Sequence, residues 1–409
     1  MEFLKVDSLE AAREKLLESA KSGLISTEVL PCSKTLGRVA AQDVFSPEDI
    51  PAFARSTVDG YAVLSSDTAG AGESIPVFLD LVGQIDMGCQ ADITISSGQC
   101  VEVFTGGMLP GGADSVVMIE YTEEFGSQGI AISQSARYGE NVAQPGEDMN
   151  VGKLIIKRGR RILPQDLGAL AAAGICEISV YSPVRVSVIS TGDELVPPNK
   201  TPLPGQIRDV NSYALSALAQ KHGLLVVSTA ILPDEQDSLE RAVRTAVSDS
   251  DIVVVSGGSS KGKKDMTRLV FDRLAAPGVY THGIALKPGK PTILGYDSSS
   301  NTLLMGLPGH PVSALMVFEL LVGWLLRTLM GVQQPPGIPA RVSSNLAASP
   351  GKLTCVPCHL TQDSDGYIAQ PVLGKSGMIS TLTQADGYFI IPRTDEGVRK
   401  GQKVLVELF

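Results

Sequence analysis

The region from about residue 177 to 330 constrains the fold most, because strand-length apolar runs alternate there with helix-length amphipathic runs. This alternation is typical of a largely parallel sheet with helices on both faces. We expect strands at 184–190, 225–232, 251–256, 292–295 and 302–307. We expect helices at 211–222, 236–248, 265–274 and 311–330. The sequence therefore predicts a doubly wound, mostly parallel α/β domain over 176–332.

The flanking regions predict further domains, since 409 residues are too many for a single apolar core. Across 46–135, short β-type runs alternate with Gly-rich turns, which predicts a β-rich insert domain. The chain on either side of this insert, 1–45 and 136–175, would then form one discontinuous, helical N-terminal domain. Residues 333–409 begin with a Pro-rich linker at 335–339 and predict a small C-terminal β barrel or sandwich.

Charge and cysteine content exclude several classes of protein. The net charge of −10 argues against a nucleic-acid partner. Six cysteines spread over the whole chain do not form a disulfide scaffold, and we interpret Cys355 and Cys358 as strand residues rather than zinc ligands. The N-terminus does not resemble a signal peptide, and the apolar run 314–326 is too short to span a bilayer. We therefore expect a cytoplasmic protein with no membrane contact.

Polar and Gly-rich turns follow or flank the strands of the predicted sheet. In an open parallel sheet, ligands bind at the carboxyl ends of the strands. The turns that we expect at this rim are STGDEL at 190–195, PD at 233–234, SGGSS at 256–260, KPGKP at 287–291 and GLPGHP at 306–311. Each alone is consistent with an ordinary turn or a helix cap. Their common location on one edge is what favours a binding site.

The residue types in these turns indicate phosphate chemistry. Glycine lets backbone amides approach a phosphate, hydroxyl groups add donors, and lysine adds positive charge. Carboxylates beside phosphate donors suit a phosphoanhydride held through Mg²⁺. The phosphate-binding candidates are Thr191, Gly192, Ser256, Gly257, Gly258, Lys287, Lys290, Pro308 and Gly309. The candidate metal ligands and catalytic acids are Glu194, Asp234 and Asp265.

Several motifs along the chain resemble those of a known family. The runs TVDGYAV, FTGGMLPGGADSVVMIE, PGEDM, STGDELV, GQIRDVNSY, VSGGSSKGKKD, IALKPGKPTILG, GLPGHPVSALM and GKSGMISTL extend over essentially the whole chain. Together they resemble the molybdopterin molybdenumtransferase (MoeA) family, to which the E domain of gephyrin is related. The resemblance implies a transferase that inserts molybdenum from molybdate into adenylyl-molybdopterin and releases AMP with Mg²⁺ as cofactor.

The resemblance also implies a shared active site. Members of the family are homodimers whose α/β domain, similar to the pterin adenylyltransferase MogA, faces other domains of the partner subunit. This arrangement allows contact with the adenylyltransferase that acts one step earlier. By matching positions, Asp59 and Asp148 are expected as further catalytic residues, and Thr105 and Ser376 as further substrate-binding residues.

Several positions depart from the family pattern and leave alternatives open. Ala143, Gln144 and Pro145 stand where an arginine is common, as do Lys352 and Pro357. Arginine forks bind oxyanions at two points, so a tungstate-preferring relative is one alternative. A pterin adenylyltransferase and a non-catalytic pterin-binding scaffold are the others.

Overall fold

The computed structural model describes residues 6–21, 23–126, 129–257 and 266–409. The chain divides into two compact units. Unit 1 comprises Met1–Glu28, Gly159–Arg161 and Ser179–Phe409, and unit 2 comprises Val29–Arg158 and Ile162–Ile178. Each unit has its own sheets and apolar cores. The predicted boundaries of four domains stay a prediction.

A six-stranded sheet forms the centre of the α/β part of unit 1. Its strand order is β16-β13-β17-β21-β20-β18, and the first four strands run parallel. Their bounds are β13 (Arg185–Thr191), β16 (Leu225–Leu232), β17 (Ile252–Gly257), β18 (Pro277–His282), β20 (Ile293–Asp297) and β21 (Thr302–Leu307). The mostly parallel sheet is as predicted, except that β20 runs antiparallel to both of its neighbours.

The strand β18 was not predicted from the sequence. It begins at Pro277, and it forms the edge of the sheet with β20 as its only neighbour in the sheet order. A short edge strand needs no long apolar run, because one side of it has no neighbouring strand to pack beside. The periodicity of the sequence therefore gave little sign of it.

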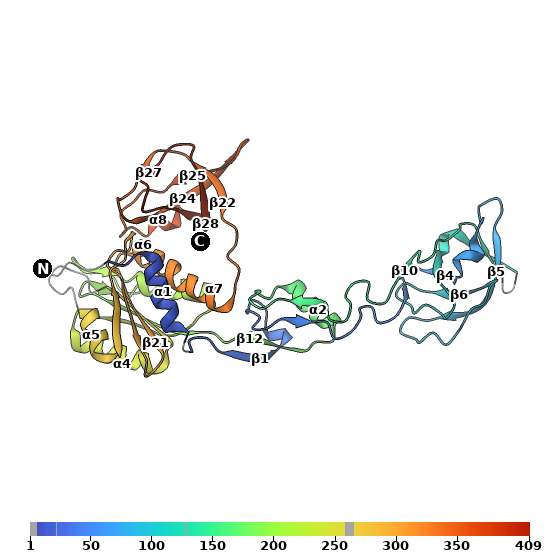
Figure 1. Ribbon diagram of the computed structural model, residues 1–409, viewed down its shortest axis with the longest axis horizontal. Coiled ribbons are helices and arrows are strands. Elements are labelled where there is room, and N and C mark those ends of the chain that lie inside the picture. The colour runs from blue at the N-terminus through green and yellow to red at the C-terminus, as the bar shows by residue number, and fades with distance from the viewer. Residues whose placement is uncertain (1–5, 22, 127–128, 258–265) are drawn as a thin grey trace. The chain divides into compact units, whose positions relative to one another are not determined.

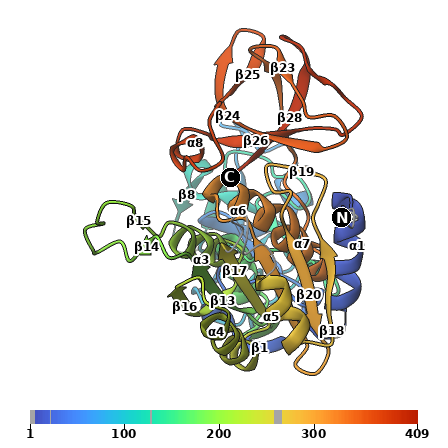
Figure 2. The ribbon, with the colours of Figure 1, turned by 90° about the vertical axis from the view of Figure 1, so that its left-hand side faces the viewer.

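Helices cover both faces of this sheet, as the alternation predicts. The helices of the predicted alternation are α3 (Asn211–Lys221), α4 (Gln236–Asp249), α5 (Met266–Leu274), α6 (Pro311–Phe318) and α7 (Trp324–Met330). The N-terminal helix α1 (Leu9–Ala20), which the alternation did not predict here, also contacts β20 and α7. On one face, Leu239 and Val243 of α4 and Phe271 of α5 pack against Ile189 and Val255 of the strands. On the other, α3 contacts α6 and β13, as Figure 2 shows.

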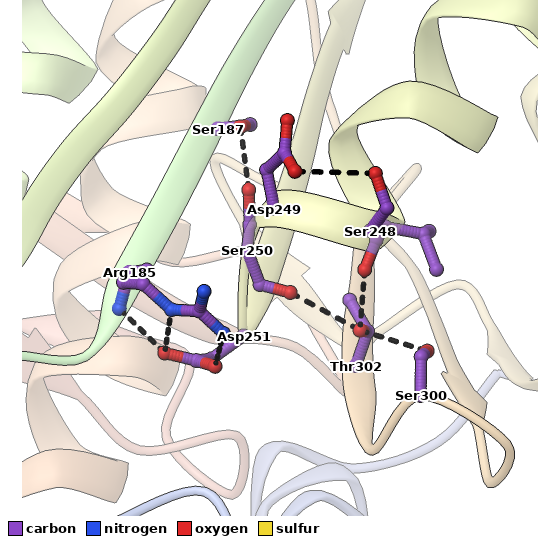
Figure 3. Close-up of polar contacts among 9 residues, drawn as sticks. Arg185, Ser187, Ser248, Asp249, Ser250, Asp251, Ser300 and Thr302 are labelled. Atoms are coloured by element: carbon purple, nitrogen blue, oxygen red, sulfur yellow. Dashed lines mark hydrogen bonds and ion pairs between the residues drawn. The ribbon is translucent and has the colours of Figure 1, made fainter.

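Polar side chains pin the strands together at their amino ends, away from the predicted rim (Figure 3). Asp251 accepts hydrogen bonds from the backbone N–H of Arg185 at 2.7 Å and from its guanidinium at 2.8 Å. The hydroxyls of Ser187 and Ser250 share a hydrogen bond of 2.6 Å, and Thr302 donates to the Ser250 carbonyl at 3.1 Å. These contacts join β13, β17 and β21 at their starts. They therefore help to fix the strand register, which also sets where the carboxyl ends of the strands lie.

The helical run 311–330 is interrupted, whereas the sequence predicts one continuous helix. A π-helical segment, η4 (Glu319–Gly323), separates α6 from α7. The carboxylate of Glu319 turns inward and binds His222 at 2.6 Å and Arg327 at 3.1 Å. Gly323 faces the His222 ring so closely that a Cβ would lie 2.8 Å from it. The extra residue in the turn therefore accommodates a buried ionic cluster that helical periodicity does not predict.

This helical run is also long and apolar enough to cross a membrane, by length and composition alone. In the structure, 67% of its most apolar window is buried inside the protein, where α6 contacts β21 and α3. It is thus a core helix of the α/β part.

The C-terminal part of unit 1 is a closed β barrel, which decides between the predicted barrel and sandwich. The ring closes because β24 pairs with both β25 and β26, and β28 joins β26 to β22. Val356, Phe389 and Val406 fill its interior. The elements, gathered in the red part of Figure 1, are β22 (Ile338–Val342), β23 (Leu346–Ala347), β24 (Leu353–Asp363), β25 (Gly366–Pro371), α8 (Ser380–Thr383), β26 (Gly387–Ile391), β27 (Gly397–Val398) and β28 (Lys403–Leu408).

Unit 2 contains the β-rich insert that the sequence predicts. Its main sheet has the order β7-β4-β6-β5-β9-β8, with an apolar cluster on each side around Val101 and around Ile130. The bounds are β4 (Gly60–Val63), β5 (Val77–Ile85), β6 (Gln99–Val103), β7 (Ser115–Met118), β8 (Thr122–Phe125) and β9 (Gly129–Ile132). Short pairs are formed by β2 (Val44–Phe45) with β11 (Leu154–Ile156) and by β3 (Arg55–Ser56) with β10 (Val142–Ala143), and the helix is α2 (Pro164–Ala172).

We predict that protonation of Glu319 lowers the stability of the protein at acid pH. Burial alone would raise the pKa of this carboxyl, but the hydrogen bonds and charges of His222 and Arg327 outweigh it and lower the pKa to about 2. A depressed folded-state pKa stabilises the protein above the unfolded value and loses that effect as pH falls from about 4.5 toward 2. By pH 3 the free energy of unfolding should have fallen by about 2 kcal/mol, measured by urea unfolding at pH values between 7 and 3.

The control for this prediction is the exposed Glu14 of α1. Glu14→Gln should leave the pH dependence of the midpoint unchanged, whereas Glu319→Gln should flatten it. An equally steep acid loss in Glu319→Gln would show that another carboxylate is responsible.

Candidate functional site

The register of the sheet places the predicted turns along one edge. At the carboxyl ends of the strands, Thr191 pairs with Leu232 on one side and with Gly257 on the other. Ser256 pairs with Leu307, and the next strand begins at the same level with Ile293. The antiparallel β20 starts where its parallel neighbours end, so the loop 287–291 before it reaches this edge too.

A buried carboxylate organises the turns at this edge. Asp209 is 3% exposed and accepts a hydrogen bond from the Ser190 hydroxyl at 2.9 Å. It also accepts from the backbone N–H of Asn211 at 3.0 Å and of Ser212 at 3.3 Å, and from the Ser212 hydroxyl. A buried charge requires this many donors. Asp209 thereby caps α3 and fastens its start to the end of β13.

Asn211 extends this network to two more turns. Its amide Nδ2 donates to the Ser256 hydroxyl and to the Gly309 carbonyl, both at 2.8 Å. The Ser256 hydroxyl donates in turn to the Pro308 carbonyl at 3.3 Å. Asn211 therefore holds the predicted residues Ser256 and Gly309 directly, and it holds Pro308 through the Ser256 hydroxyl.

Two buried oxygen atoms at this edge have no hydrogen-bond partner among the described residues. They are Oδ1 of Asn211 and Oγ1 of Thr191. The two residues are 9% and 3% exposed, respectively. Buried polar atoms are nearly always hydrogen-bonded in folded proteins, so these two are candidate contacts for a bound ligand. Both lie beside the predicted phosphate-binding turns.

Glycine is required at Gly257 by the closeness of the neighbouring strand. Its φ of 123° lies in the region that other residues rarely adopt, and a Cβ would meet the Thr191 carbonyl at 2.1 Å. Gly192 similarly has the Glu194 carboxylate folded over it, with an oxygen 2.8 Å from the position of a Cβ. Both turns are therefore tight, and they leave their backbone close to the rim.

The predicted metal ligands are acidic residues in the turns after β13 and β16. The backbone N–H of Asp234 donates to Asp193 at 2.9 Å, which ties these two turns together next to the exposed Glu194. Among the residues that the structure describes, no three His, Cys, Asp or Glu side chains are gathered closely enough to hold a metal ion. The predicted residues Asp265 and Gly258 lie outside the described residues.

A cavity of about 680 Å³ lies between the loop 287–291, the turn at 308–310 and the C-terminal barrel. The predicted residues Lys287, Lys290, Pro308, Gly309 and Ser376 all line it, and the barrel adds Lys352 and Thr354. Thr354 is buried, and its hydroxyl has no partner among the described residues. The described lining contains three lysines and a histidine but no carboxylate, so it suits an anionic ligand.

Two contacts join the rim of the sheet to the barrel at this cavity. The short strand β19 (Leu286–Lys287) pairs in parallel with Leu353 and Thr354 of β24. His310 Nδ1 lies 2.7 Å from the Ser376 hydroxyl, and the Val312 backbone N–H donates to the Ser376 carbonyl at 3.1 Å. The lysine loop is therefore fixed by main-chain bonds on the barrel side.

The predicted residues of unit 2 form a separate group. Asp59 accepts from the backbone N–H and the hydroxyl of Thr105, at 2.7 and 2.8 Å. These two bonds lower the pKa of the exposed Asp59 carboxyl below its usual value. Asp148 is exposed in the turn after β10, and its backbone N–H donates to the Ile50 carbonyl at 3.0 Å. Asp59 and Thr105 thus act as a pair in a turn that is open to solvent.

Asp209, Asn211 and Thr354 were not predicted as site residues, and Lys352 was noted only as a departure from the family pattern. A signal for the first two existed, since GQIRDVNSY places a carboxylate just before a helix and an amide at its first residue, where side chains often cap helices. Lys352 and Thr354 gave no such signal, because their place at the cavity follows from the pairing of β24 with a distant strand.

Comparison with family models gives matches over most of the chain. Residues 7–174 match the MoeA N-terminal region (domain I and II), residues 187–328 match a probable molybdopterin binding domain, and residues 339–409 match the MoeA C-terminal region (domain IV). The middle match contains the sheet and its rim, and the last contains the barrel.

Individual relatives match along their full length. A molybdopterin molybdenumtransferase of Haemophilus influenzae is 32% identical over 407 residues, covering 98% of each chain. Another, of Bacillus subtilis, is 30% identical and covers 93% of this chain and 90% of its own. A solved structure of a molybdopterin biosynthesis MoeA protein from Pyrococcus horikosii is 37% identical, with a TM-score of 0.84 and 99% of each chain covered.

We predict that Asp209→Asn weakens both the fold and the rim. An amide NH₂ cannot accept the bonds that Asp209 now accepts, so buried donors lose their partner. The free energy of unfolding should fall by about 2 kcal/mol in urea titrations. Hydrogen exchange of the amides at 256–257 should accelerate, while the exposed Asp237→Asn at the start of α4 should change neither. Unchanged exchange at 256–257 would contradict the organising role of Asp209.

Proposed function

This chain belongs to the MoeA family, and we propose that it inserts molybdenum from molybdate into adenylyl-molybdopterin and releases AMP. The coarser function, transferase of molybdenum cofactor biosynthesis, follows from family membership over the whole chain. The finer reaction breaks a phosphoanhydride and moves a metal oxyanion, so it needs a cationic, donor-rich site. The observation that carries the proposal is the cavity with three lysines and no described carboxylate.

In this proposal, Lys287 and Lys290 bind the phosphates of the substrate. Both side chains are exposed, and they belong to a loop whose main chain is fixed by the pairing of β19. Binding a ligand here therefore costs little further main-chain entropy. Lys352 and the Ser376 hydroxyl add donors from the barrel for a phosphate or for the metal oxyanion. The proposed phosphate contacts from the sheet are the turns at Thr191, Gly192, Ser256, Gly257 and Gly309.

Mg²⁺ is the proposed cofactor, and its donors come from the acidic turns. Glu194 and Asp234 offer only carboxylate oxygens, which are the ligands that Mg²⁺ prefers. In this proposal, substrate oxygens and water would supply the remaining ligands of the cation. When bound, the cation would neutralise charge on the breaking phosphoanhydride. Asp265 remains part of the proposed ligand set on the basis of sequence alone.

Asp59 and Asp148 serve the metal oxyanion indirectly in this proposal. A carboxylate repels molybdate, so these residues would orient water or a donor group rather than bind the oxyanion. The hydroxyl and amide of Thr105 keep the Asp59 carboxyl ionised and pointed in one direction. As the family resemblance implies, these residues would act on the site of a partner subunit in a homodimer. The expected cytoplasmic location stays a prediction.

The first test is release of AMP from adenylyl-molybdopterin in the presence of molybdate and Mg²⁺. Lys290→Ala and Lys287→Ala should each lower kcat/KM by about tenfold to a hundredfold, because each removes a charge that faces the phosphates. The exposed Lys221→Ala at the end of α3 should leave kcat/KM unchanged.

Three other outcomes would decide against the proposal. Equal AMP release in both cavity variants and in the native protein would remove the lysines from the reaction. Consumption of ATP with the free pterin and without molybdate would indicate an adenylyltransferase. Tight binding of the pterin without turnover, for molybdate and tungstate alike, would indicate a scaffold.

The second test examines whether one active site uses residues of two subunits. Asp59→Asn and Lys290→Ala should each retain about a tenth of native activity or less, but their mixture should regain activity after subunit exchange. In a mixed dimer one site carries both changes and the other carries neither, so an equal mixture should reach about a quarter of native activity. No recovery, although exchange is shown by native mass spectrometry, would place both residues in a site of the same subunit.

A further inference from the structure

Two cysteines lie opposite one another where a two-stranded ribbon ends. The ribbon consists of β1 (Thr27–Pro31) and β12 (Glu177–Tyr181). Cys32 directly follows β1 and Cys176 directly precedes β12, and the Cys32 backbone N–H donates to the Cys176 carbonyl at 2.8 Å. At the other end, the Ser182 N–H donates to the Ser26 carbonyl at 2.9 Å. Residue numbers therefore rise along one strand as they fall along the other, and the ribbon is antiparallel.

This register brings the two side chains to the same face. Directly opposite residues at a hydrogen-bonded position have Cα atoms about 5.5 Å apart. A disulfide requires a Cα separation of about 4.4 to 6.8 Å. Cys32 and Cys176 share one backbone hydrogen bond just beyond the paired strands, so their main chains approach closely at the point where a disulfide would form.

The surroundings of the two thiols assign them different roles. Cys176 is exposed, whereas Cys32 is half-buried and its thiol donates to the Ile175 carbonyl at 3.3 Å. Burial, and then the neighbouring Cys176, raise the pKa of the Cys32 thiol. A thiol with a raised pKa is a poorer first nucleophile at neutral pH, so Cys176 would react first and Cys32 second.

The remaining cysteines offer no competing pair among the described residues. Cys100, Cys355 and Cys358 are buried, and burial raises the pKa of each thiol to about 12. Buried thiols in apolar surroundings are inert. Cys89 is exposed and serves as an internal reference for a thiol without a partner cysteine opposite to it.

We propose that Cys32 and Cys176 form a reversible disulfide by exchange with a small disulfide such as glutathione disulfide. The Cys176 thiolate attacks one sulfur of glutathione disulfide, forms a mixed disulfide and expels one glutathione thiolate. The Cys32 thiolate then attacks Sγ of Cys176 and expels the second glutathione. The two cysteines lose two electrons and two protons, and one glutathione disulfide becomes two glutathione molecules, so the step balances.

The bond would close residues 33–175 into one covalent loop. Unit 2 comprises Val29–Arg158 and Ile162–Ile178, so nearly all of it lies inside this loop. A crosslink at the two chain ends of a folded unit stabilises it mainly by restricting its unfolded state. Oxidation would therefore stabilise unit 2 and leave the cavity residues of unit 1 chemically unchanged.

The test treats the reduced full-length protein with glutathione disulfide, alkylates the remaining thiols and identifies tryptic peptides by mass spectrometry. The expected product is a linked pair of peptides containing Cys32 and Cys176, lighter by two hydrogen atoms and separated by dithiothreitol. Thermal unfolding should shift to higher temperature on oxidation and return on reduction. The shift should be absent in Cys32→Ser and Cys176→Ser, and present in the control Cys89→Ser.

The order of attack provides a second readout. Cys32→Ser should accumulate a stable glutathione adduct on Cys176, because the second thiol is missing, whereas the native protein should accumulate little. If oxidised native protein keeps both thiols free for alkylation, or ends with glutathione on both cysteines, the proposal is wrong. Neither readout depends on AMP release, so the result is independent of the proposed transferase reaction.

Discussion

The buried carboxylate of Asp209 is the interaction on which the arrangement of the site depends. It joins the end of β13 to the start of α3 through Ser190 and the backbone of Asn211. Asn211 continues the same chain of bonds to Ser256 and Gly309. Three turns from distant parts of the sequence are thereby held at fixed positions by two neighbouring side chains. Burying such a charge is costly unless its oxygens are satisfied, and here two backbone N–H groups and two serine hydroxyls donate to the carboxylate.

Charge in this protein is distributed unevenly, and the distribution serves the site. The chain as a whole carries a net charge of −10, yet the described lining of its large cavity has three lysines and no acid. The surrounding negative charge disfavours non-specific binding of polyanions, while the local lysines attract a small and highly charged ligand. The acids proposed as cation ligands lie in the neighbouring turns after β13 and β16, outside the cavity lining.

The sequence predicted what is periodic and local. The α/β alternation, the β-rich insert and the set of rim turns all follow from patterns within about ten residues. The strand β18, the π-helical turn at Glu319 and the pairing of Lys287 with Thr354 do not, because each depends on a contact with a distant segment. Closure of the barrel likewise depends on a single pairing, β24 with β26, that separates a barrel from a sandwich. Asp59 and Ser376 were found through family resemblance and not through any pattern of their own.

The parallel pairing of β19 with β24 means that the domain to which a segment belongs by sequence differs from the sheet to which it is hydrogen-bonded. By sequence the lysine loop belongs to the α/β domain, but its main chain is hydrogen-bonded as an extra strand of the C-terminal barrel. Exchanging the barrel between relatives by cutting the Pro-rich linker at 335–339 would therefore transfer β24 without its pairing strand β19. A chimera that respects the hydrogen bonds needs residues 286–287 from the same parent as β24, although about 65 residues lie between them.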